Sequence, residues 1–85
     1  MAIERAILLA ILNAVENRQQ PYNVIGGSVT TERNVGNHIA WLGARGYART
    51  VPSGEDDNGD DIVSITTSGQ EFHRQLKAEK ARGRF

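Results

Sequence analysis

The 85-residue chain has no cysteine, only two prolines and a single tryptophan. The lack of cysteine excludes disulfide bonds and thiolate metal sites, and it suits a protein of the cytoplasm. The longest apolar run is AILLAIL, residues 6–12, whereas a membrane-spanning helix needs about 20 residues. One Arg precedes this run and no small-residue cleavage site follows it, so we expect neither a membrane span nor a secretory signal.

Patterns typical of catalytic and metal sites are also missing. No Ser-His-acid or paired-carboxylate spacing is present, and the segment VIGGSV lacks the Lys of a phosphate-binding loop. An EF-hand loop with Gly59 at its sixth position would have Gly54 and Ile65 at the first and twelfth, where oxygen ligands are required. A looser calcium site at residues 55–61 is the alternative. We therefore expect a protein that is not an enzyme and that needs no cofactor or metal.

The charge of the chain is balanced in total but uneven along the sequence. Ten Lys and Arg residues face ten Asp and Glu residues, so the formal net charge is zero. Five of the acids lie in EDDNGDD, residues 55–61, and the rest of the chain has ten basic and five acidic residues, or +5. Such an excess suits a polyanionic partner, whereas the acidic segment opposes one.

Apolar spacing and turn residues predict one α+β domain. In chain order we expect a helix over 2–19, irregular turns over 22–30, a helix over 31–45, strands over 47–51 and 62–66, and a helix over about 67–82. Residues 1–78 would form the domain, and 79–85 a frayed basic tail. The two strands form a hairpin whose long tip carries the acidic segment.

Several residues mark where these elements begin and end. Pro21 would stop the first helix, and Thr30 or Thr31 would cap the helix over 31–45. Gly46 would end that helix in a left-handed conformation. The last helix would be capped by Thr66 or Ser68. Zipping the hairpin around Asn58-Gly59 would place aspartates opposite each other, so a loose tip is expected.

The helix over 2–19 has an unusually wide apolar arc. Ile3, Ile7, Ile11 and Ala14 form one stripe and Leu8, Leu12 and Val15 the next. Either the small domain covers this helix on two sides, or one side meets a second copy of the chain. We predict a homodimer through residues 2–19 on the second reading and keep the first as its alternative.

Two motifs, VGNHIAWLGARGYART at residues 35–50 and ITTSGQEF at residues 65–72, together resemble the winged helix-turn-helix domains of MarR-, ArsR- and PadR-type regulators. Residues 35–50, VGNHIAWLGARGYART, resemble the recognition-helix signature, with Val35, His38, Ile39, Leu42 and Gly46 at the matching positions. Residues 65–72, ITTSGQEF, resemble the exit from the wing. The resemblance covers about residues 3–76 and implies a DNA-binding transcription regulator. It departs from the family in the Gly26-Gly27 pair, in the few basic residues of the recognition helix and in the acidic wing tip.

The resemblance implies that the helix over 31–45 enters the major groove of double-stranded DNA by its first half. Arg33, Asn34 and Asn37 are then the candidates for reading bases. Candidates for phosphate contact or close approach are Thr31, Gly36, Arg45 and Arg49. We interpret His38 as a packing and hydrogen-bonding residue and His73 as a surface residue. Trp41 would anchor the wing or the first helix.

A second hypothesis gives the same fold a different partner. An acidic wing and a sparsely basic recognition helix suit a basic or nucleic-acid-associated protein that docks at the tip, residues 55–61. Fold does not dictate function, so both hypotheses rest on the site.

Overall fold

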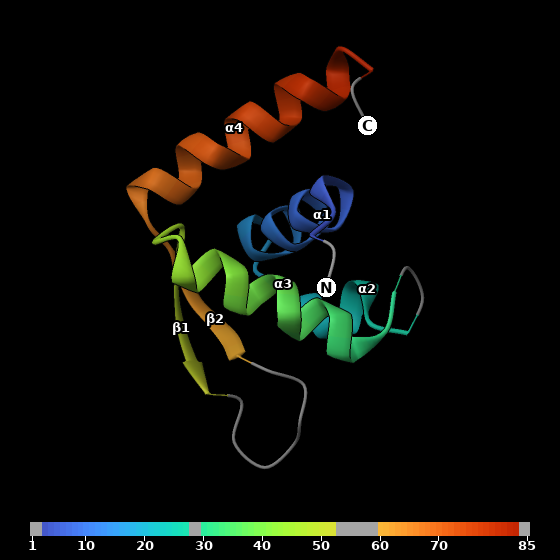
Figure 1. The fold of residues 1–85 in the computed structure, drawn as a ribbon, viewed down its shortest axis with the longest axis vertical. Coiled ribbons are helices and arrows are strands. Elements are labelled where there is room, and N and C mark those ends of the chain that lie inside the picture. Colours follow the sequence, from blue (N-terminus) through green and yellow to red (C-terminus); the bar gives the residue numbers. More distant parts are fainter. Residues whose placement is uncertain (1–2, 28–29, 53–59, 84–85) are drawn as a thin grey trace.

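Four helices and one two-stranded hairpin make up the chain in the computed structural model, which describes residues 3–27, 30–52 and 60–83 (Figure 1). The elements are α1 (Arg5–Glu16), α2 (Pro21–Ile25), α3 (Glu32–Ala44), β1 (Ala48–Pro52), β2 (Asp60–Ile65) and α4 (Thr67–Ala81). This α+β order is the predicted one, and it is compatible with a winged helix.

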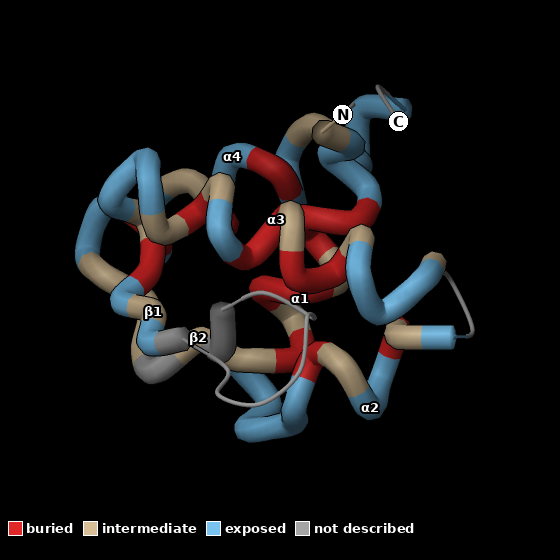
Figure 2. The backbone as a smooth tube through the Cα atoms, turned by 60° about the horizontal axis from the view of Figure 1, so that its bottom comes forward, coloured by how far each residue is buried: buried red, intermediate tan, exposed pale blue. Residues whose placement is uncertain are grey.

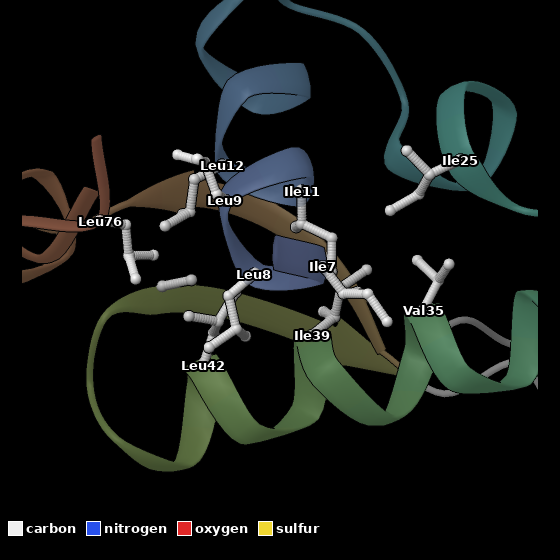
Figure 3. Packing of buried hydrophobic residues seen from close by; sticks show 11 residues of the cluster. Ile7, Leu8, Leu9, Ile11, Leu12, Ile25, Val35, Ile39, Leu42 and Leu76 are labelled. Atoms are coloured by element: carbon white, nitrogen blue, oxygen red, sulfur yellow. The ribbon is translucent and has the colours of Figure 1, made fainter. Parts of the chain in front are cut away.

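The core lies where α1 crosses α3. Leu8 and Ile11 of α1 point toward Ile39 and Leu42 of α3, and α2 and α4 close the two sides with Ile25 and Leu76 (Figure 3). The predicted stripe of Val35, Ile39 and Leu42 is fully buried. At about 25 cal/mol per Å² of apolar surface, such side chains give a small domain most of its stability.

The wide apolar arc of α1 is covered within the chain. The six buried residues of α1 all belong to the core of the single chain: Ile7, Leu8, Leu9, Ile11, Leu12 and Ala14. Figure 2 shows α1 as largely buried, while exposed residues gather on α2, the loops and the outer side of α4. Five of the seven arc residues are therefore buried within the chain, and Ile3 and Val15 are half-buried, so the arc does not require a second copy and the homodimer stays a prediction.

The first helix and the turns after it differ from the prediction in detail. α1 ends at Glu16, before Pro21, because Arg18 takes a left-handed conformation with φ of 58°. Pro21 begins the short helix α2, where its missing N–H costs nothing. Gly26 follows the last residue of α2, and Gly27 has φ of 81°, so the glycine pair ends α2 as its composition indicates.

The hairpin pairs in a register that keeps its aspartates apart. Asp60 and Asp61 lie opposite Pro52 and Val51, not opposite other acids, and one register shift follows Arg49. Zipping around Asn58-Gly59, which we expect to be unfavourable because aspartates would face each other, is not the register of the described strands. Most of the tip, residues 53–59, lies outside the described residues.

The two family-like motifs meet at one turn. Thr66 caps α4, accepts from the N–H of Gly69 at 3.0 Å and donates its hydroxyl to the carbonyl of Gly46 at 2.7 Å. Gly46 has φ of 77°, as predicted for the end of α3. A Cβ on Gly69 would overlap the carbonyl oxygen of Tyr47, so only glycine fits there. The turn after α3 and the start of α4 therefore fix each other.

Polar contacts join α1 to α4. Arg5 pairs with Glu79, and Lys77 Nζ lies 3.1 Å from Oε2 of Glu16. Because α4 continues to Ala81 and Glu79 is ion-paired, the domain boundary predicted at residue 78 falls inside a helix.

In the described part of the chain, no helix is long and apolar enough to cross a membrane.

The prediction that His73 is a surface residue was wrong. His73 is 6% exposed, and its Nε2 lies 2.7 Å from Oδ1 of Asn13 in α1. Its Nδ1 lies 3.3 Å from Oε2 of Glu16. Burial and the Lys77 ammonium lower the pKa of His73 below its ordinary value of 6.5, while the Glu16 carboxylate opposes this shift. His73 is therefore part of the joint between α1 and α4.

Candidate nucleic-acid interface

The start of α3 is fixed by the side chains of Thr30 and Thr31. Thr31 is the N-cap, and its hydroxyl oxygen accepts from the N–H of Asn34 at 3.2 Å. The Asn34 side-chain amide donates to the hydroxyl of Thr30 at 2.9 Å. Asn34 is half-buried and held by these bonds, so its structural role competes with the predicted base contact. Thr31 is exposed, and its own O–H stays a donor for an incoming anion.

His38 extends this network into the core. Its ring is fully buried, Nδ1 donates to the carbonyl of Asn34 at 2.7 Å, and Nε2 accepts from the N–H of Glu4 at 3.0 Å. Accepting at one nitrogen and donating at the other requires the neutral ring with its proton on Nδ1. The predicted packing and hydrogen-bonding role of His38 is confirmed, and the ring ties the start of α1 to α3.

One face of α3 is left free by this packing. Arg33, Ala40 and Ala44 are exposed on that face, and Asn37 is half-buried between them. Among the described residues, the Arg33 and Asn37 side chains have no hydrogen-bond or ion-pair partner. Both are donors that this face presents outward, and the small Ala40 and Ala44 give an approaching surface close access to the helix.

Gly36 does not belong to that face. It is buried, because its position lies on the flank of α3 that turns toward the hairpin. Gly43 lies on the same flank, where a Cβ would be 2.8 Å from Oγ1 of Thr50 in β1. The burial of Gly36 does not fit the predicted close approach of a DNA groove at this position.

The two arginines predicted to contact phosphate, Arg45 and Arg49, are both exposed. Arg49 is exposed on β1, on the hairpin side. Arg45 is the exposed C-cap of α3, and its guanidinium lies over the ring of Trp41, 4.9 Å from the ring centroid. The hairpin packs beside α3 in Figure 1.

The side chain of Trp41, in α3, packs toward α4. Its ring centroid lies 6.1 Å from that of Tyr47, just before β1, and 6.0 Å from that of Phe72 in α4. One ring partner thus lies at the start of the hairpin, which is one of the two anchors predicted for Trp41, and the other belongs to α4. Trp41 and Phe72 also line a groove of about 690 Å³ between α1, α3 and α4, together with Ile3, Arg5, Leu8, Gln75, Ala78, Glu79 and Arg82. Sequence spacing gave no signal for this groove, because its walls come from three separate helices.

Arg74, Lys77 and Lys80 lie on α4, and Arg82 is its C-cap. Lys77 is paired with Glu16, whereas Arg74, Lys80 and Arg82 are exposed and make no ion pair with a described residue. No group of three or more His, Cys, Asp and Glu side chains that would hold a metal occurs within the described ranges. The predicted protein-docking segment 55–61 lies largely outside those ranges.

Comparison with protein-family models, curated proteins and solved structures gave no match for this chain. The assignment of a function therefore rests on the geometry of the chain itself.

Proposed function

We propose that the chain is a small winged-helix protein that binds double-stranded DNA through the free face of α3 and acts as a transcription regulator. The observation that carries this proposal is the exposed Arg33 beside the half-buried Asn37 on a helix whose opposite face is fully buried. Arg recognises guanine and Asn recognises adenine by two hydrogen bonds each in the major groove.

The surroundings of this pair support the same partner. Arg45 at the end of α3 and Arg49 on β1 supply exposed cations, and the Thr31 hydroxyl lies at the helix start. Contacts from such groups to phosphates set the register of a protein on the duplex, and base contacts then give the specificity. Oligomeric state forms no part of the proposal, because the α1 arc that suggested a dimer is buried.

Fluorescence anisotropy of a labelled mixed-sequence duplex tests the proposal. With Arg45 and Arg49 as the phosphate-neutralising cations, we expect affinity to fall between about 50 and 200 mM salt with a log–log slope of about −1.8, at about 0.9 per contact. The matched control is the double variant with Gln at these two positions, which keeps the fold and loses the slope. No binding of the parent chain at the lowest salt would refute the proposal.

One observation favours a protein partner as the second candidate. In its first half, the free face of α3 carries a single cation, Arg33, and five acids lie in residues 55–61. A basic protein that is captured in stoichiometric amounts after nuclease treatment, and that is lost when the five acids are replaced by Asn and Gln, would support this candidate.

A further inference from the structure

The three arginines proposed to contact DNA, Arg33, Arg45 and Arg49, differ in the contacts that their side chains make within the chain. Arg33 and Arg49 are exposed and make no ring or ion-pair contact with a described residue. Arg45 is also exposed, but its guanidinium lies over the Trp41 ring. The Arg45 side chain is therefore held in position before a partner binds, whereas those of Arg33 and Arg49 have no such support among the described residues.

The Trp41 ring is itself held by a stack of aromatic side chains. Tyr47 and Phe72 are stacked with centroids 4.4 Å apart and an interplanar angle of 7°, and Trp41 packs against both rings at a tilt. The backbone beneath Tyr47 is fixed as well. Its N–H donates to the carbonyl of Leu42 at 2.9 Å, and its carbonyl accepts from the N–H of Thr66 at 3.2 Å.

A guanidinium that lies on an aromatic ring keeps its hydrogen-bonding capacity. The ring attracts the flat face of the group, whereas all five N–H donors point outward in the plane of the guanidinium. A phosphate can then approach the edge of Arg45 without displacing it from Trp41. Placing the side chain in advance also lowers the conformational entropy that it loses on binding.

We propose that Trp41 is a positioning residue, which holds Arg45 at the α4 side of the free face for contact with a DNA phosphate. The inference rests on the proposed DNA binding and adds that Trp41, with Tyr47 and Phe72 behind it, contributes to affinity without touching DNA. Through Phe72, the helix α4 is part of the support for this contact.

A double-mutant cycle on DNA affinity tests the inference. Trp41→Leu should weaken binding about two- to tenfold, the entropic gain of one pre-placed side chain. It should also shift the salt slope toward that of Arg45→Gln, which is lower in magnitude by about 0.9. In the Arg45→Gln background, Trp41→Leu should change nothing further. Trp41→Phe, which keeps a ring beneath the guanidinium, should restore most of the affinity and the slope.

Arg33→Gln is the matched control, because Arg33 makes no contact with the described aromatic rings. Trp41→Leu should weaken binding by the same factor in this background as in the parent. An equal effect in the Arg45→Gln background would contradict the inference, since Trp41 would then act through folding or by touching DNA itself. Circular dichroism at the assay temperature shows whether each variant is folded, and Trp41→Phe serves if Trp41→Leu is not.

A measurement without DNA separates this inference from the proposed function. In the free chain, the indole ring should shift the side-chain proton resonances of Arg45 upfield, and Trp41→Leu should abolish the shift while Arg33 and Arg49 are unchanged. Absence of that shift in the parent would overturn the inference alone. A parent chain that shows the shift but binds no duplex would overturn the proposed function, and the phosphate role of Arg45 with it.

Discussion

The two faces of helix α3 differ in the burial and the contacts of their side chains. Val35, Ile39 and Leu42 are fully buried under α1, whereas Arg33 and Asn37 lie on the other side without a described partner. Stability should therefore be sensitive on one face and partner binding on the other. The comparison fails if substitutions on the two faces have the same consequences.

The largest effect is expected on the buried face. Ile39→Ala should lower the free energy of unfolding by about 2–5 kcal/mol, because it removes apolar contacts and leaves a cavity. Ala40→Ser, at the exposed neighbouring position, should change it by less than about 0.5 kcal/mol. Urea denaturation of both variants measures the difference. Equal effects at the two positions would break the comparison.

The turn that fixes the end of α3 gives the next effect. Gly69→Ala should lower the free energy of unfolding by about 1–3 kcal/mol, since its Cβ would overlap the Tyr47 carbonyl oxygen. Ser68→Ala in the same helical turn is the control and should be near neutral, because Thr66, not Ser68, caps α4. Thermal unfolding of the pair checks both statements. A near-neutral Gly69→Ala would show that the turn tolerates a side chain.

The free face should respond in binding and not in stability. Arg33→Ala should weaken binding to a preferred DNA sequence by about 1–3 kcal/mol and relax the preference at one base position. Arg74→Ala removes an equal charge from α4 and should leave that preference unchanged. Anisotropy titrations with single-base variants of the duplex measure both. If Arg74→Ala has the larger effect, the binding surface is α4.

The joint between α1 and α4 should give a smaller, pH-dependent effect. The pKa of His73 is lowered in the folded chain, so folding favours the neutral ring. This contribution is fully present above about pH 6.5 and is lost as the pH falls through 6.5 toward the folded-state pKa. Unfolding free energies of the parent and His73→Gln across this range should converge at acidic pH. A difference that grows on acidification would reverse the sign and contradict the pKa shift.

Local patterns predicted the parts of the fold that depend on neighbours in sequence. The spacing of Val35, Ile39 and Leu42 gave the buried stripe, and Thr31 and Gly46 gave the ends of α3 within one residue. Thr66 and Gly69 belong to the motif that resembles the exit from the wing, and in the structure Thr66 bonds Gly46 and Gly69 lies against the Tyr47 carbonyl. Short-range hydrogen bonds and backbone conformations decide such features, so the sequence is informative there.

Features that depend on distant segments were missed. His73 meets Asn13, which lies 60 residues earlier, and no local signal marks such a contact. The arc of α1 has the same pattern whether the chain or a second copy covers it. Gly36 was expected at the groove because a glycine allows close approach, but the same property serves packing against the hairpin flank. Of the three base-reading candidates, only the Arg33 and Asn37 side chains make no hydrogen bond or ion pair with a described residue, whereas Asn34 bonds Thr30.

The central claim is that DNA contacts the free face of α3. Amide and side-chain chemical-shift mapping, with a short duplex added stepwise to the isotope-labelled chain, tests this claim most directly. We expect the largest changes at Arg33, Asn37, Ala40 and Arg49, with the guanidinium of Arg45 also affected. Changes confined to Arg74, Lys80 and Arg82 of α4, or no change at low salt, would contradict the claim.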